Sequence, residues 1–91
     1  MKEIIMRRLN CSEKRAALIE GDLLRLSPPL VPALNAWLEK EDYTDDTRYH
    51  GYSIHSLMQD MDMRFTGAIL TIDWIIREPE KALAALAEPI R

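Results

Sequence analysis

The most regular apolar pattern in the chain lies between residues 54 and 75. Its members are separated by alternating steps of four and three residues, which places them on one face of an α-helix. They are Ile54, Met58, Met61, Phe65, Ala68, Ile72 and Ile75. Ser53, which precedes them, is a favourable N-cap residue. The pattern therefore predicts one long central helix from Ile54 to about Arg77.

A second set of apolar residues lies on the opposite side of this predicted helix. At about 100° per residue, Met63, Leu70 and Trp74 point away from the main seam, next to Gly67. A helix with two apolar faces needs a neighbour on each face, either a helix of the same chain or a second copy of the chain. Glycine costs a helix interior about 1 kcal/mol relative to alanine, so Gly67 suggests close approach by a neighbour. We predict that Met63, Leu70 and Trp74 form a self-association surface of a homodimer, with burial in the core as the open alternative.

Three other segments carry helical signals. Ser12 is a favourable N-cap for a helix that runs to about Leu26. Residues 28–41 begin with prolines suited to a first helical turn, and residues 79–87 begin with another proline. Residues 2–9 suit either a helical turn or a short strand. Together these elements predict an all-α fold, a small irregular four-helix bundle around the long helix in one domain of residues 1–91, with a short N-terminal strand as an option.

The stretch from Asp42 to Tyr52 is the longest one without helical spacing. Its threonine and aspartate residues and Gly51 are typical of turns. Tyrosine and arginine are enriched in binding surfaces, and this stretch is rich in both. We predict that it binds a partner through Asp42, Tyr43, Asp45, Asp46, Arg48, Tyr49, His50 and Tyr52.

Composition narrows the class of protein. The 91 residues are 47% hydrophobic and include one cysteine, Cys11, so a disulfide framework within the chain is excluded. Neither a signal-peptide pattern nor an apolar run of membrane-spanning length is evident. We therefore expect a cytoplasmic protein that does not enter a membrane.

Charge is distributed unevenly along the chain. The net charge is −3 overall, +3 over residues 2–15 and −5 over residues 39–62. An acidic surface repels phosphate backbones and attracts basic surfaces, so direct nucleic-acid binding by the middle of the chain is disfavoured. The expected partner is a protein with a basic surface.

Candidate chemistry in the sequence is sparse. His50, His55 and Asp62 are the basis of an alternative in which the protein binds a metal ion or is an enzyme, but no metal-binding or catalytic motif accompanies them. The basic N-terminal segment, with Arg7 and Arg8, is the basis of a second alternative, a DNA-binding accessory protein.

The preferred hypothesis is a non-enzymatic helical module that binds protein and needs no metal or cofactor. Its concrete version is a small acidic inhibitor or regulator of a nucleic-acid-processing partner, of the anti-CRISPR or antirestriction type. The hypothesis rests on the size of the chain, its acidic middle and the missing catalytic motifs.

Overall fold

The computed structural model describes residues 1–87, which form helices joined by short connections and one longer loop. Over these residues there are six α-helices and one short 3₁₀ helix, and no strand. The all-α class is thus confirmed, whereas the count of four helices is wrong. The chain divides after Asp42 into two compact units, Met1–Asp42 and Tyr43–Arg91. That the chain is one domain stays a prediction.

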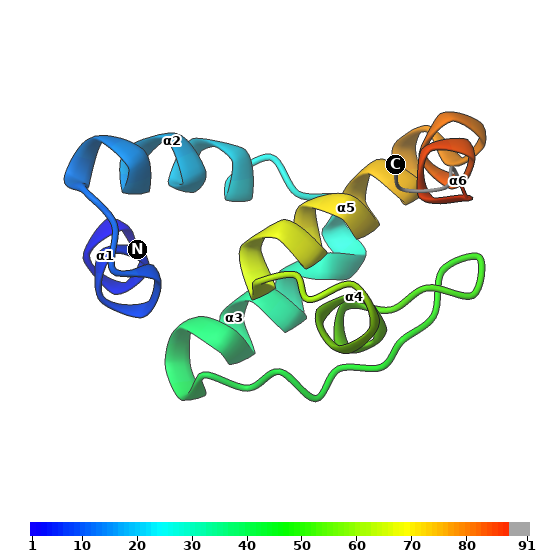
Figure 1. Ribbon diagram of the computed structural model, residues 1–91. Coiled ribbons are helices and arrows are strands. Elements are labelled where there is room, and N and C mark those ends of the chain that lie inside the picture. The colour runs from blue at the N-terminus through cyan, green and yellow to red at the C-terminus, as the bar shows by residue number, and fades with distance from the viewer. Residues whose placement is uncertain (88–91) are drawn as a thin grey trace. The chain divides into compact units, whose positions relative to one another are not determined.

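The first unit begins with two helices that pack on each other (Figure 1). Residues 2–9 form a helix, so the optional N-terminal strand is wrong; the helix ends at Asn10, whose φ of 51° is left-handed. Ser12 caps the next helix as predicted, because its side chain accepts a hydrogen bond from the N–H of Arg15 at 3.2 Å. The helices of this unit are α1 (Lys2–Leu9), α2 (Glu13–Leu23), the 3₁₀ helix η1 (Pro28–Leu30) and α3 (Val31–Lys40).

The first unit closes at the carboxyl end of α3. Glu41 adopts a left-handed φ of 53°, and the N–H groups of Glu41 and Asp42 donate to carbonyl oxygens of the last turn. These bonds satisfy acceptors that a helix end otherwise leaves without partners. The buried apolar residues of the unit are Ile5, Ala16, Leu23, Leu30, Ala33, Leu34 and Trp37.

The second unit contains the segment that the apolar seam predicted as one long helix, and that prediction is wrong. The segment forms α4 (Ile54–Asp60) and α5 (Phe65–Arg77), separated by a short break. Asp62 has a left-handed φ of 54°, a conformation that aspartate tolerates better than most residues. Met61, a seam position, is 41% exposed at this break. Helical spacing therefore continues across a point where the backbone does not.

Within the second unit, α5 packs against both α4 and α6 (Pro79–Ala87), and α6 has the predicted bounds (Figure 1). The seam residues of α5 are buried, as the spacing predicts: Phe65, Ala68, Ile72 and Ile75. Among the helices of residues 1–87, none is sufficiently long and apolar to cross a membrane.

Candidate partner-binding site

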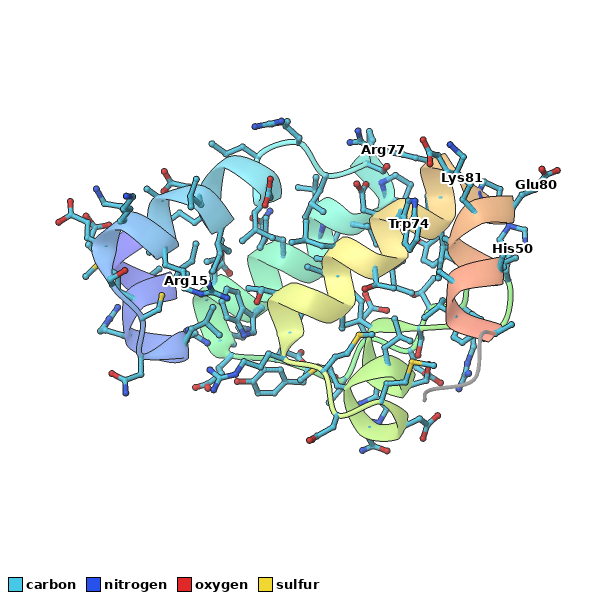
Figure 2. All side chains as sticks on the ribbon, turned by 45° about the horizontal axis from the view of Figure 1, so that its top comes forward. Arg15, His50, Trp74, Arg77, Glu80 and Lys81 are labelled. Atoms are coloured by element: carbon cyan, nitrogen blue, oxygen red, sulfur yellow. The ribbon has the colours of Figure 1, made fainter. Side chains whose placement is uncertain are left out.

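A tight turn lies at the end of the loop that precedes α4. The N–H of Tyr49 donates to the carbonyl of Tyr52 at 2.7 Å, and the N–H of Tyr52 donates back to Tyr49 at 3.0 Å. His50 and Gly51 between them have φ values of 52° and 88°, and positive φ at both central residues is typical of a type I′ hairpin turn. Gly51 makes this turn possible, and His50 is exposed at its end (Figure 2). Residues 45–52 are called the hairpin loop below.

Asp46 ties the hairpin loop to the first turn of α4. Its carboxylate accepts a hydrogen bond from the Ser53 hydroxyl at 2.6 Å and lies 3.3 Å from the guanidinium of Arg48. Arg48 also donates to the carbonyl of Gly51 at 2.9 Å. The hydrogen bond from Ser53, helped by the charge of Arg48, lowers the pKa of Asp46 below its usual value. The carboxylate is thus held in its ionised form.

Hydrogen bonds between near neighbours in the sequence fix the hairpin loop at its start and at its junction with α4. The Asp45 carboxylate accepts a hydrogen bond from the N–H of Thr47 at 2.9 Å, which forms an Asx turn and leaves the acid at the surface. Ser53 and Ser56 form a capping box, because each side chain bonds the backbone N–H of the other, at 3.0 and 2.9 Å. The hairpin loop therefore has a defined conformation although it contains no helix.

Tyr43 packs within the second unit instead of joining the hairpin loop. Its ring meets Phe65 edge to face, with 6.2 Å between the ring centroids. Its carbonyl oxygen lies 3.2 Å from Nδ1 of His55. Asp42 belongs to the first unit, where it closes α3. Of the eight residues predicted to bind a partner, six lie in the hairpin loop: Asp45, Asp46, Arg48, Tyr49, His50 and Tyr52.

The residues of the metal or enzyme alternative occupy three different elements. His50 is at the tip of the turn, His55 is on α4, and Asp62 is in the break between α4 and α5. Among residues 1–87, no three histidine, cysteine, aspartate or glutamate side chains are grouped so that they could hold a metal ion.

Arg8, one of the two arginines of the DNA-binding alternative, is engaged inside the first unit. Its guanidinium donates to the carbonyl of Leu38 at 3.0 Å, lies 5.3 Å from the ring centroid of Trp37 and approaches Glu41 at 3.8 Å. The side chain is only 18% exposed, whereas Arg7 is exposed. Arg8 thus links α1 to the end of α3, which disfavours it as a phosphate contact.

The predicted self-association residues are covered to different degrees. Met63 precedes α5 and is half-buried, Leu70 is half-buried, and Trp74 is 39% exposed. The Trp74 indole nitrogen donates to a Glu78 carboxylate oxygen at 3.4 Å. At Gly67, no atom of another segment lies within 4 Å of the position that a Cβ would occupy. Within the described residues of the second unit, no neighbour makes the close approach that Gly67 suggested.

The sequence predicts a loop over residues 42–52, which the structure contains, but it does not predict which residue anchors that loop. The sequence predicts Ser53 as a helix cap, and its hydroxyl also donates a hydrogen bond to Asp46. An aspartate that lies several residues before a serine cap, as Asp46 lies before Ser53, is the one signal that could have indicated this second role. Comparison with protein-family models, curated proteins and solved structures found no match to the chain.

Proposed function

We propose that the chain is a non-enzymatic protein-interaction module that uses the hairpin loop to bind the basic surface of a protein partner. The observation that carries this proposal is the combination of order and exposure in the loop. Asp46, Arg48 and Ser53 fix the backbone through their own hydrogen bonds. Asp45 and His50 stay exposed. A surface ordered before binding loses less conformational entropy when the partner arrives.

The distribution of charge supports a basic partner. Residues 1–42 contain seven basic and seven acidic side chains, whereas residues 43–91 contain five basic and eight acidic ones. All of the net charge of −3 therefore belongs to the second part of the chain. Complementary charge speeds association and suppresses binding to wrong partners.

The concrete form of the proposal is a small inhibitor or regulator of a nucleic-acid-processing enzyme, of the anti-CRISPR or antirestriction type. Such enzymes hold nucleic acid in positively charged channels, which an acidic protein surface can occupy. The proposal includes a homodimer that forms through Met63, Leu70 and Trp74, since Trp74 remains 39% exposed.

The test is DNA cleavage by a purified CRISPR nuclease and by a restriction endonuclease, each with and without the protein. We expect inhibition of at least one enzyme at about 50 mM salt and much weaker inhibition at about 500 mM, because salt screens exposed charges. Asp45→Asn should weaken inhibition, since asparagine keeps the Asx turn and removes the charge. The matched control is Glu80→Gln, which removes an exposed charge from α6.

Two results would count against the proposal. Inhibition that is equal at both salt concentrations would contradict the electrostatic mechanism. Equal loss of inhibition in Asp45→Asn and Glu80→Gln would show that overall charge, rather than the hairpin loop, is responsible.

A further inference from the structure

The exposed face of α5 carries a large side chain and, about two helical turns away, a glycine with open space above it. Trp74 is 39% exposed, and its indole nitrogen is directed to Glu78 on the following turn. Gly67 has open space where a Cβ would stand. The two positions are seven residues apart, which corresponds to roughly 10 Å along a helix. Leu70 lies midway between them on the same face and is half-buried.

We infer that a second copy of this chain docks on α5 in antiparallel orientation, with Trp74 of each copy seated over Gly67 of the other. This inference rests on the self-association included in the proposed function and specifies its geometry. In a two-fold interface, each contact between residues i and j occurs twice. An antiparallel helix pair centred near Leu70 places position 74 of one copy opposite position 67 of the other. The protruding Trp74 side chain and the open space at Gly67 therefore make this face of α5 complementary to the same face of a second copy.

The polar groups of this face are compatible with burial. The Thr71 hydroxyl donates to the carbonyl of Gly67 at 2.8 Å, so it is satisfied within the helix. Asp73 and Arg77 pair at 3.0 Å, which offsets their charges. Glu78 stays half-exposed at the carboxyl end of α5, where it accepts a hydrogen bond from Trp74 and lies 3.8 Å from Lys81.

The ends of the face also favour the antiparallel arrangement. Arg64, the N-cap residue of α5, and Glu78, its C-cap residue, carry opposite charges. An antiparallel pair brings Arg64 of each copy toward Glu78 of the other, whereas a parallel pair brings like charges together. The antiparallel pair also sets the two helix macrodipoles in opposition.

The experiment is analytical ultracentrifugation of the native full chain and of four variants over a range of protein concentrations. We expect a native dimer, and a dissociation constant raised at least tenfold in Gly67→Trp and in Trp74→Gly. The double variant Gly67→Trp with Trp74→Gly exchanges the protruding side chain and the open space, so it should recover most of the native affinity. Leu18→Gly, on an exposed position of α2, is the control for helix destabilisation and should leave the dimer unchanged.

Circular dichroism of each variant establishes that it remains folded before its mass is interpreted. A native chain that is monomeric at all concentrations would overturn both the self-association and its geometry. A native dimer that tolerates both single substitutions, or that the double variant fails to restore, would overturn the Trp74–Gly67 geometry alone. The binding of a basic partner by the hairpin loop would stand in either case.

Discussion

Arg8 in the first unit and Arg48 in the second contact similar groups, yet the two side chains differ in how far they are exposed to solvent. Each donates to a backbone carbonyl and approaches a carboxylate. Arg8 is also stacked near Trp37 and is 18% exposed, so its charge is used to join two helices. Arg48 is 54% exposed and organises a loop whose other charges face outward. The charge of Arg8 thus supports packing within the first unit, whereas the charge of Arg48 organises a loop in which Asp45 stays exposed.

The largest expected effect comes from the aromatic residue beneath Arg8. Trp37 is 1% exposed, so Trp37→Ala should reduce the free energy of unfolding by about 3–5 kcal/mol, the usual cost of removing a large buried side chain. Trp74→Ala, at a position that is 39% exposed, should change it by about 0.5 kcal/mol at protein concentrations low enough that no dimer forms. Urea denaturation followed by circular dichroism measures both. Similar losses in the two variants would contradict the assignment of Trp37 to the core and Trp74 to the surface.

The second prediction compares the free energy of unfolding lost when each of the two arginines is replaced. Arg8→Gln should cost about 1.5–3 kcal/mol, because it removes a charge-assisted hydrogen bond from a mostly buried position. Arg48→Gln should cost about 0–1 kcal/mol, as is usual for an exposed ion pair. The same denaturation experiment measures both changes. If Arg8→Gln proved as mild as Arg48→Gln, the structural role of Arg8 would be wrong.

The third effect compares two helix caps. Ser53→Ala should cost about 1–2 kcal/mol, because it removes the cap of α4 and the hydrogen bond to Asp46 together. Ser12→Ala, which removes the cap of α2, should cost about 1 kcal/mol. Nuclear magnetic resonance distinguishes the two further, since only Ser53→Ala should return the pKa of Asp46 toward its usual value. An unchanged pKa would exclude Ser53 as the anchor of the hairpin loop.

The smallest effect depends on pH. Because folding lowers the pKa of Asp46 from its usual 3.8, the ionised carboxylate stabilises the folded chain. That contribution is complete above pH 3.8 and is lost as the pH falls through the lower folded-state value. Native protein should therefore be slightly more stable than Asp46→Asn at pH 7, and the difference should vanish in acid. A difference that grows as the pH falls would reverse the sign of this linkage.

Local signals in the sequence predicted local structure well. The all-α class, the caps at Ser12 and Ser53, and the helix over residues 79–87 follow from spacing and capping chemistry within a few residues. The break at Asp62 was missed because the apolar spacing on either side of it remains in register with one continuous helix. The spacing of apolar residues indicates which face of a helix they share. It does not indicate whether the helix is continuous between them.

The contacts that bury Arg8 join residues that are distant in the sequence. Arg8 meets Leu38, which is 30 residues away, and no pattern near Arg8 indicates that partner. The hairpin loop was easier to predict, since Asp46, Arg48 and Ser53 lie within eight residues of one another. Its composition predicts a binding surface, which stays a prediction, whereas the type I′ turn and the anchoring role of Ser53 are seen only in the structure.

The most direct test of this account is a nuclear magnetic resonance titration of the isotope-labelled chain with a short arginine-rich peptide at low salt. Amide signals of residues 45–52 should shift progressively and return when salt is added, while those of Arg8 and Trp37 should stay in place. Shifts centred on the acidic end of α3, or spread evenly over all exposed acids, would contradict the claim that the hairpin loop binds a basic partner.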